Sequence, residues 1–137
     1  DWISRKKGFE HVPDIVIGNF AMPWNRKLVD WVSSPTAIDE VGSIHTVQGY
    51  DLNYAGVIIG KDLQFDPATQ EIVFSRSDYF DKKGVENNPR LGLVFSDSEI
   101  LEFVKNIYRV LLTRGIKGTY VYVCDPNLRE YLRRFFA

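Results

Sequence analysis

The stretch from Val41 to Gly60 constrains the fold most strongly, because two apolar runs of different character flank a polar turn. Before Gln48, apolar and polar residues alternate, which is typical of a half-buried strand. After Asn53, the run Ala55-Gly56-Val57-Ile58-Ile59 shows no alternation. An unbroken apolar run of this length is typical of a strand buried on both faces in a parallel sheet. The stretch therefore predicts two strands and an α/β fold with a mostly parallel sheet.

Polar side chains gather around the turn between these runs, where Gln48 is followed by Gly49. The others are Ser43, His45 and Asp51. Glycine permits close approach to the backbone, and ligands of α/β proteins bind beyond the carboxyl ends of strands. We therefore expect a ligand site at this turn.

The rest of the chain alternates between strand and helix signals. The clearest helix starts with the capping box Ser96-Asp97-Ser98-Glu99, continues with apolar residues at helical spacing and is expected to stop at Gly115. A second helix starts at Asp125-Pro126, and a short one is expected from Asn25 to Val32. The other expected elements are strands at 14–18, 71–75, 78–81 and 119–123, a helical turn at 36–40, and loops at 61–69 and 82–90. Residues 1–137 are expected to form a single α/β domain with flanking helices and a small peripheral β-hairpin.

Two segments resemble motifs of superfamily-one helicases. Ser43-Ile44-His45-Thr46-Val47-Gln48-Gly49-Tyr50-Asp51 resembles motif V, whose hydroxyl, histidine, glycine and acid fall at the same offsets. Val110-Leu111-Leu112-Thr113-Arg114 resembles motif VI, which the family places at the end of a later helix. The sequences around both motifs are similar to the helicase-like domain of the Schlafen-type bacterial family. The resemblance implies a second, RecA-like motor domain of a helicase or translocase.

The resemblance also implies roles for single residues. It makes Arg114 the catalytic arginine finger, and a rigid, always charged guanidinium suits the spread charge of a transferring γ-phosphoryl group. The alternative explanation of Arg114 is structural, because the helix dipole by itself favours a cation at the C-terminal end of a helix. Asp51 is one methylene shorter than the glutamate usual in the family. The implied nucleotide-binding residues are Gln48, Gly49, Asp51 and Thr113, and the implied nucleic-acid-binding residues are Ser43, His45 and Thr46.

ATP and Mg²⁺ are the implied cofactors, and single-stranded DNA or RNA is the implied partner. The phosphate-loop pattern GxxxxGK[ST] is absent from the 137 residues, and in such motors the first RecA-like domain carries it together with the Mg²⁺ ligand. We therefore expect an N-terminal RecA-like domain in the same protein. The chain alone is expected to bind ATP weakly and to hydrolyse none. It begins at Asp1 rather than Met, and we expect it to be a fragment of a longer protein.

Composition limits the remaining possibilities. The formal net charge is −1, so any nucleic-acid contact is expected to be a local groove rather than the effect of a globally basic surface. A single cysteine, Cys124, excludes an internal disulfide and is compatible with a reducing compartment. The chain has neither a signal-peptide pattern nor an apolar run long enough for a membrane span. We expect a soluble, cytoplasmic protein that does not contact the membrane.

Three alternative interpretations stay open. In the first, the chain is a non-enzymatic RecA-like module that binds nucleic acid or protein, and in the second it is a nuclease whose scattered acids bind a divalent metal. The third concerns Trp24 and Trp31, which either stack on bases or close the core. We favour the interpretation in which the loop acids are solvated and form no metal site, and in which the two tryptophans belong to the core. Arg109 is expected to be structural or solvated, and the C-terminal arginines are expected to form a solvated basic face or to meet another domain of the intact protein. The acids are Asp62, Asp66, Asp78, Asp81 and Glu86, and the C-terminal arginines are Arg129, Arg133 and Arg134.

Overall fold

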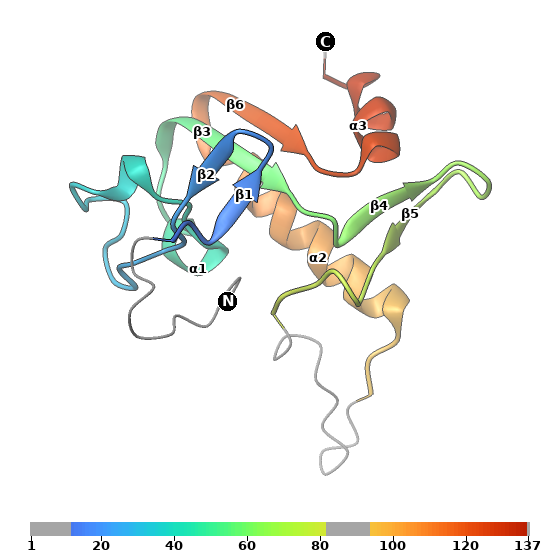
Figure 1. The fold of residues 1–137 in the computed structure, drawn as a ribbon. Coiled ribbons are helices and arrows are strands. Elements are labelled where there is room, and N and C mark those ends of the chain that lie inside the picture. The colour runs from blue at the N-terminus through green and yellow to red at the C-terminus, as the bar shows by residue number, and fades with distance from the viewer. Residues whose placement is uncertain (1–11, 82–93, 137) are drawn as a thin grey trace. The chain divides into compact units, whose positions relative to one another are not determined.

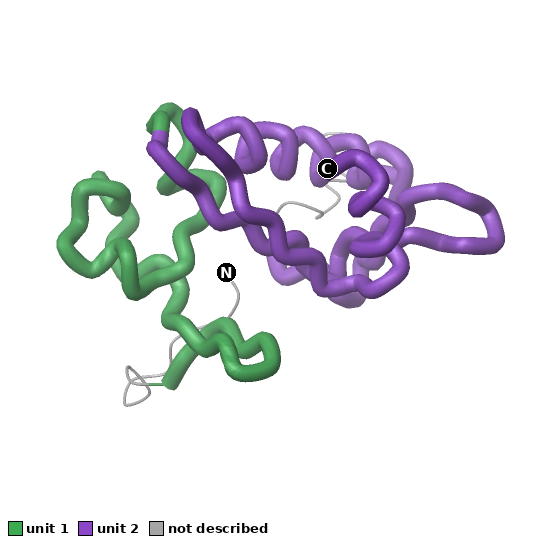
Figure 2. Tube along the Cα trace, turned by 90° about the horizontal axis from the view of Figure 1, so that it is seen from above, with its two compact units in different colours: residues 1–51 green, residues 52–137 purple. Residues whose placement is uncertain are grey.

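The computed structural model describes residues 12–81 and 94–136 (Figure 1). They form a mixed α/β chain with a parallel strand pair, two antiparallel strand pairs and three α-helices. The chain divides into two compact units, Asp1–Asp51 and Leu52–Ala137 (Figure 2). The α/β prediction is therefore correct, while the loop expected at 82–90 lies outside the described residues. The single domain expected from the sequence stays a prediction.

The first unit is built from short elements joined by irregular backbone. Strands β1 (Ile15–Ile17) and β2 (Phe20–Met22) form an antiparallel hairpin whose turn contains Gly18 at φ +58°. A 3₁₀ turn, η1 (Ala37–Asp39), and one turn of α-helix, α1 (Ile44–Val47), follow. The strand expected at 14–18 and the helical turn expected at 36–40 are thus confirmed, whereas β2 was not predicted.

The buried carboxylate of Glu40 organises the irregular part of this unit. Its Oε2 accepts hydrogen bonds from the backbone amide of Arg26 at 2.8 Å and from Trp31 Nε1 at 3.1 Å, and its Oε1 accepts one from Thr36 Oγ1 at 2.7 Å. The indole of Trp31 is buried and packs so closely on Gly42 that a Cβ there would lie 2.6 Å from the ring. Trp31 therefore closes a core, as expected.

The short helix expected from Asn25 to Val32 is absent. Asn25 has φ +33°, and its amide donates to the carbonyl of Val41 at 2.9 Å, so the backbone is committed to a bridge instead of a helical turn. The apolar side chains that a helix would have buried, Leu28 and Val29, are 78% and 76% exposed. A helix here would have no apolar face to bury, and helical propensity alone does not hold so short a segment.

The strand expected before Gln48 is also wrong. Val41 forms only an isolated parallel bridge with Trp24, and the chain then turns into α1. The cause is Ser43, whose carbonyl accepts hydrogen bonds from the amides of Thr46 at 3.0 Å and Val47 at 3.1 Å. Over so few positions, the spacing of the apolar residues was compatible with both the strand period and the helix period. The cap at Ser43 favours the helix.

The second unit contains a parallel pair formed by β3 (Leu52–Ile59) and β6 (Gly115–Val123), which lie side by side in Figure 1. Between them the chain forms the antiparallel hairpin of β4 (Leu63–Asp66) and β5 (Glu71–Phe74), and then the long helix α2 (Asp97–Leu112). The last helix is α3 (Pro126–Arg133), whose N-cap Asp125 accepts from the amide of Leu128 at 2.7 Å. The predicted parallel strand, the long helix and the C-terminal helix are confirmed.

An apolar core joins one face of the parallel pair to α2, α3 and β4. Its most buried members are aliphatic, with Leu128 at 0% exposure and Ile100, Val104 and Ile59 at 2%. Phe65 of β4 stacks on Tyr131 of α3, with ring centroids 4.4 Å apart. Phe135 and Phe136 follow the end of the last helix and are 66% and 55% exposed.

Two strand assignments need correction. The loop expected at 61–69 contains β4, in which Leu63 and Phe65 are buried and alternate with Gln64 and Asp66. The hairpin partner of β5 is therefore β4, and residues 78–81 form no strand. In β3 only one face is buried, through Ala55, Val57 and Ile59.

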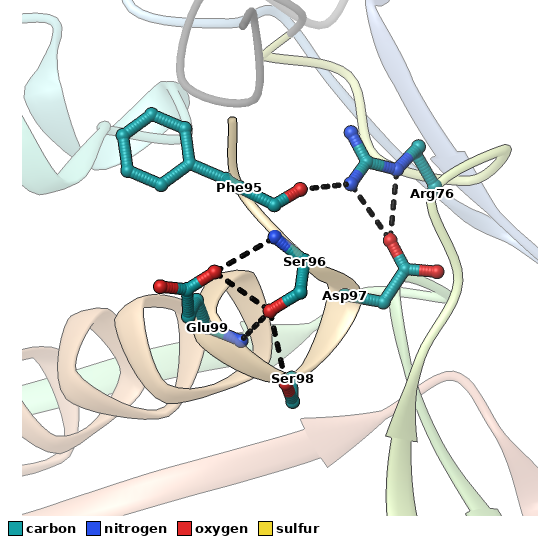
Figure 3. A network of polar contacts seen from close by, with 6 residues as sticks. All are labelled: Arg76, Phe95, Ser96, Asp97, Ser98 and Glu99. Carbon is teal, nitrogen blue, oxygen red and sulfur yellow. Dashed lines mark hydrogen bonds and ion pairs between the residues drawn. The ribbon is translucent and has the colours of Figure 1, made fainter. Parts of the chain in front are cut away.

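The capping box of α2 forms as expected (Figure 3). The Ser96 amide donates to Glu99 Oε2 at 2.8 Å, and the Glu99 amide donates to Ser96 Oγ at 3.3 Å. Arg76, which follows β5, donates to Asp97 Oδ1 and to the carbonyl of Phe95, so the start of the helix is also tied to the hairpin. The first turn of α2 is thus fixed by both local and long-range contacts.

Candidate functional site

The segment that resembles motif V forms a compact turn in the first unit. Ser43 is the N-cap of α1, and its amide donates to Thr46 Oγ1 at 2.9 Å. Thr46 Oγ1 in turn donates to the carbonyl of Ser43 at 3.0 Å. Thr46 is 5% exposed, so its hydroxyl is used inside the turn. The structure therefore brings these two residues together, with Thr46 holding the conformation of Ser43.

The other polar residues of this segment face solvent. His45, Gln48, Gly49 and Asp51 are all exposed. Gly49 has φ +84°, which is the left-handed region that favours glycine, and no atom lies within 4 Å of the position a Cβ would take. The backbone at Gly49 is consequently open to approach, which is the property that the sequence predicted for it.

Tyr50 links this turn to an earlier part of the first unit. Its hydroxyl donates to Asp30 Oδ1 at 3.3 Å. The negative charge of Asp30, together with this hydrogen bond, raises the pKa of the Tyr50 phenol above its usual value. Tyr50 therefore stays neutral and remains a donor to Asp30 at physiological pH.

The motif V-like segment does not follow the carboxyl end of a strand. It precedes β3, whose first residue is Leu52, and the strand expected before it is α1. The topological argument that placed a ligand site beyond a strand end therefore does not apply to this turn. Its candidate role depends on the exposed residues themselves.

The segment that resembles motif VI forms the junction between α2 and β6. Thr113 is the C-cap of α2, and its hydroxyl lies within hydrogen-bond distance of the carbonyls of Arg109 at 3.1 Å and Val110 at 3.0 Å. Arg114 is half-buried, and its Nε donates to the Val110 carbonyl at 3.0 Å. Arg114 Nη2 also lies 3.3 Å from Thr113 Oγ1. The two candidate residues of this motif are thus in direct contact.

The main chain of Arg114 is fixed on both sides. Its amide donates to the carbonyl of Leu111 at 3.2 Å, and its carbonyl accepts from the amide of Leu52 at 2.9 Å. Leu52 is the first residue of β3, so the start of the parallel pair holds the arginine backbone in place. The backbone of Arg114 is therefore anchored from two sides, in addition to the contact of its Nε with the Val110 carbonyl.

Gly115 was expected to be the stop of α2, but the helix ends at Leu112 with Thr113 as its C-cap. Gly115 is instead the first residue of β6 and has no positive φ. A Cβ at Gly115 would overlap the carbonyl oxygen of Gly118 and lie 2.7 Å from Thr119 Oγ1. The glycine is therefore required by a close approach within the strand, and Thr119 Oγ1 satisfies the Leu112 carbonyl at 3.1 Å.

A buried polar pair at the other end of β3 was not predicted. Asp62 was expected to be a solvated loop acid, but it is 8% exposed. Tyr108 of α2 contributes its hydroxyl, which lies 3.3 Å from both carboxylate oxygens of Asp62 and accepts from the Gly60 amide at 3.0 Å. Tyr108 lies on the apolar face of α2, and a polar tip on a buried face was the available signal that a partner must exist.

The electrostatics of this pair follow from burial. Burial raises the pKa of the Asp62 carboxyl, although hydrogen bonds from its surroundings, including Tyr108, oppose the shift. Burial and the nearby Asp62 charge raise the pKa of Tyr108 far above its usual value. Burial likewise raises the pKa of the half-buried Cys124 thiol. The contact of Asp62 with Tyr108 ties the end of β3 to α2, and the raised pKa of Cys124 disfavours its thiolate form.

Arg129 is structural, contrary to the expectation of a solvated basic face. Its Nε and Nη2 donate to the carbonyl of Val123 at 2.9 Å and 2.7 Å. Its guanidinium carbon lies 5.2 Å from the centroid of the Tyr122 ring. Arg129 therefore joins α3 to the end of β6, while Arg133 and Arg134 are exposed.

The described residues offer no ready metal site. No group of three or more His, Cys, Asp or Glu side chains among residues 12–81 and 94–136 is placed to hold an ion. A cavity of about 280 Å³ lies between α2, α3 and the strands of the second unit. Its lining is mostly aliphatic and also includes Lys105, Arg109 and Thr113, so it has few of the polar groups that a nucleotide would need. None of the described helices is long and apolar enough to cross a bilayer.

The comparison with known proteins supports the resemblance to the Schlafen-type helicase-like family, and the assignment to a second motor domain stays a prediction. Residues 1–125 match the family described as Schlafen group 3, DNA/RNA helicase domain. The chain is 38% identical over 126 residues to the uncharacterised protein YPL245W of Saccharomyces cerevisiae. That match covers 85% of this chain and 26% of the yeast protein, so the chain spans about a quarter of the relative. No solved structure matches the chain significantly. With most of its length matched, the chain belongs to the Schlafen group 3 DNA/RNA helicase domain family.

Proposed function

We propose that this chain is the second, RecA-like motor domain of an ATP-dependent nucleic-acid helicase or translocase. In this proposal Arg114 is the arginine finger, and the exposed turn of the first unit contributes to nucleotide and nucleic-acid binding. The family match supports a helicase-related function. The finer assignment depends on one observation, which is the anchoring of Arg114.

The anchoring of Arg114 is what an arginine finger requires. Its amide, its carbonyl and its Nε are each held by a backbone partner, at Leu111, Leu52 and Val110. A guanidinium is planar, permanently charged and suited to phosphate oxygens. Electrostatic catalysis works best when the charge is fixed before the reaction, because no reorganisation is then needed. Arginine fingers accelerate nucleotide hydrolysis by about 10³- to 10⁵-fold.

Nucleotide contacts are proposed for the exposed part of the motif V-like turn. The open backbone at Gly49 can approach phosphate oxygens, and the Asp51 carboxylate can accept a hydrogen bond from a ribose hydroxyl. Gln48 is exposed beside them and offers an amide donor and acceptor. Thr113 touches Arg114 and is proposed to orient its guanidinium.

Nucleic-acid contacts are proposed for the start of the same turn. Hydroxyls and backbone amides bind phosphate oxygens well, and His45 is exposed where it can contact the strand. Ser43 is half-buried and keeps its hydroxyl 3.3 Å from Thr46 Oγ1. The buried Thr46 is proposed to act by positioning Ser43 and not by touching the nucleic acid.

ATP and Mg²⁺ fit this chain only in part. The described residues provide a guanidinium, an open glycine backbone and a carboxylate, but no cluster of three metal ligands. The Mg²⁺ ion would polarise the phosphates and neutralise their charge. We propose that a phosphate loop and a metal ligand from another RecA-like domain of the same protein hold both groups, and that this chain alone does not hydrolyse ATP.

The test is nucleic-acid-stimulated ATP hydrolysis by the full-length protein. Replacing Arg114 with Ala should lower turnover by at least ~10²-fold, which corresponds to about 2.7 kcal/mol of transition-state stabilisation. Arg109→Ala is the matched control, because Arg109 is exposed on α2 just before Arg114. The turnover of this variant should stay within ~3-fold of wild type. Arg114→Lys should remain impaired, because an ammonium lacks the planar fork.

The same assay can contradict the proposal. If the full-length protein binds single-stranded nucleic acid but hydrolyses no ATP, the chain is a binding module on a helicase-like scaffold. If Arg114→Ala and Arg109→Ala retain equal turnover, Arg114 is not the finger. Circular dichroism of each variant checks that the fold is intact.

A further inference from the structure

The part of α2 that leads to Arg114 is held less by apolar packing than the part before it. Ile100 and Val104 are the buried residues of the helix, each 2% exposed. Every residue of α2 after Val104 is half-buried or exposed, up to the last helical residue, Leu112. Apolar burial alone therefore leaves the last turns of α2, and Arg114 beyond them, more free to open locally than the middle of the helix.

Tyr108 occupies the next position on the buried face of α2. It follows Ile100 and Val104 at the i, i+4 spacing that places side chains on one face of a helix. Its ring packs against the apolar core of the second unit. Its hydroxyl lies 3.0 Å from the Gly60 amide and 3.3 Å from both carboxylate oxygens of Asp62. The last turns of α2 thus start from a polar tie to the segment that follows β3.

This tie has one arrangement of donors and acceptors. A phenolic hydroxyl has a single proton and can also accept a hydrogen bond. Because the Gly60 amide is a donor, Tyr108 accepts from it and donates its own proton to the Asp62 carboxylate. Asp62 is 8% exposed, and its carbonyl accepts from the Ser75 amide at 2.8 Å. Leaving a buried group without its partner is costly, so the hydroxyl is held at this point.

The other end of β3 is tied to the same part of α2. The Leu52 amide donates to the Arg114 carbonyl at 2.9 Å. From Leu52 to Gly60 an extended strand spans roughly 26 Å, whereas α2 rises only ~9 Å from Tyr108 to Arg114. Side chains of a helix lean toward its N-terminus, so the long tyrosine reaches away from Arg114 and toward Gly60. The two ties therefore fix the end of α2 from opposite ends of the strand.

We propose that Tyr108 is a positioning residue for Arg114, because its hydroxyl ties the last turns of α2 to the end of β3 and so maintains the hydrogen bond between Leu52 and Arg114. Asp62 acts with it by accepting the proton of the hydroxyl. The consequence for catalysis rests on the proposed function, in which Arg114 is the arginine finger. The tie itself lies within the second unit and can be measured without catalysis.

The first measurement is amide hydrogen exchange in the full-length protein, resolved to single residues by mass spectrometry. Tyr108→Phe keeps the ring in the core and removes only the hydroxyl. The Gly60 amide then loses its acceptor, and the Leu52 amide should exchange at least ~10-fold faster because the far end of α2 opens locally. The Val104 amide, in the buried part of the helix, should exchange at its wild-type rate.

Tyr131→Phe is the matched control, because it removes a phenolic hydroxyl from another ring packed on the same core. It should leave all three amides unchanged. If only the Gly60 amide exchanges faster in Tyr108→Phe, or if none does, the hydroxyl has no hold on Arg114. If Leu52 and Val104 exchange faster by the same factor, Tyr108 supports the whole unit and does not position Arg114. Equal effects of the two tyrosine variants would also overturn the proposal.

Nucleic-acid-stimulated ATP hydrolysis by the full-length protein tests the consequence for catalysis. Tyr108→Phe should lower kcat at least ~5-fold and leave the KM for ATP within ~2-fold of wild type, because a displaced finger is missed mainly in the transition state. Asp62→Asn should lower kcat by a smaller factor, because its amide oxygen can still accept. The double variant should be at most ~2-fold slower than Tyr108→Phe, since both changes break one tie. Tyr131→Phe should keep both constants.

The positioning role and the proposed function fail in different ways. If Arg114→Ala loses turnover while Tyr108→Phe keeps it, Arg114 remains the finger and the role of Tyr108 is wrong. If the wild-type protein hydrolyses no ATP, or Arg114→Ala keeps its turnover, the proposed function is wrong, and hydrogen exchange alone decides whether Tyr108 holds the contact between Leu52 and Arg114. A fall in kcat without faster exchange at Leu52 would contradict the positioning role, because the hydroxyl would then act by another route.

Discussion

The two units of this chain are stabilised by different means. The second unit has an apolar core in which one face of a parallel strand pair meets two helices. Among residues 12–51 of the first unit, the longest regular elements are one helical turn and strands of three residues. The irregular backbone there is organised around the Glu40 carboxylate. The comparison shows that the candidate motifs are supported differently, one by a polar network and the other by a packed helix end.

This difference affects how precisely each motif can be held. Arg114 follows a helix whose apolar face is fixed in the core, and its carbonyl is bonded to β3. The turn from Ser43 to Asp51 is held by its own hydrogen bonds and by Tyr50, whose partner Asp30 lies on an exposed segment. Under the proposed function, the anchored Arg114 suits catalysis and the more adaptable turn suits ligand entry.

The largest expected effect comes from the core of the second unit. Leu128→Ala removes a side chain that is 0% exposed and leaves a cavity, so the free energy of unfolding should fall by about 2–5 kcal/mol. Hydrogen exchange of amides in β3 and β6 measures the loss. Phe135→Ala, at a residue 66% exposed, is the control and should change stability by less than ~0.5 kcal/mol. Equal losses would contradict the core described for this unit.

The next largest effect tests the polar network of the first unit. Glu40→Gln replaces an acceptor of three hydrogen bonds by an amide, and the mismatched donors should cost about 1–3 kcal/mol. All three tryptophans of the chain, Trp2, Trp24 and Trp31, precede residue 52, so tryptophan fluorescence reports unfolding of this part of the chain. Glu130→Gln, on the exposed side of α3, should leave the transition unchanged. If both variants behave alike, Glu40 does not organise the unit.

These two cases also show what the sequence can and cannot reveal. Helices α2 and α3 were predictable because their caps and their apolar periodicity reflect the core against which they pack, and strand β3 was predictable from its unbroken apolar run. The backbone from Asn25 to Val32 was not predictable, because its conformation is set by Glu40 and Val41, which lie some distance along the chain. Local propensity cannot register such a partner.

The candidate sites divide in the same way. The exposure of His45, Gln48 and Asp51 and the positive φ of Gly49 agree with what a polar turn predicts. The burial of Thr46 was not foreseen, because its hydroxyl is satisfied within the turn. The pair of Asp62 and Tyr108 was missed because the two residues come from separate elements, and only tertiary packing brings them together.

Acid pH should separate the two units by the sign of its effect. The pKa of Glu40 is below its usual value, because hydrogen bonds from Thr36, Arg26 and Trp31 outweigh the burial that opposes them. Its contribution is therefore present above pH ~4.5 and is lost as the pH falls through the lowered pKa. The pKa of Asp62 is raised by burial, so its contribution is present below pH ~3.8 and is lost as the pH rises through the raised pKa.

The measurement compares two variants across pH 3 to 7. Glu40→Gln should flatten the acid loss seen by tryptophan fluorescence, and Asp62→Asn should flatten the opposite trend seen in hydrogen exchange of β3 and α2. If both variants change the same limb of the profile in the same direction, the two carboxylates are not in opposite environments, and the contrast between the units is wrong.

The smallest expected effect concerns the start of α2, where local hydrogen bonds act on a helix already fixed by the core (Figure 3). Ser96→Ala removes the Oγ that accepts from the Glu99 amide and donates to Glu99 Oε2 at 2.7 Å. Loss of such a cap costs about 1 kcal/mol. Hydrogen bonds from Ser96 also lower the pKa of Glu99, so this pKa should rise toward its usual value in the variant, as NMR titration can show. Ser98→Ala removes a neighbouring hydroxyl that is not the cap and should leave both quantities nearly unchanged.

Because Ile100 and Val104 anchor the next turns, the helix should persist up to Leu112 and keep Arg114 in place, so ATP turnover should not fall. A fall in turnover as large as that of Arg114→Ala would show that the core does not by itself fix the far end of the helix.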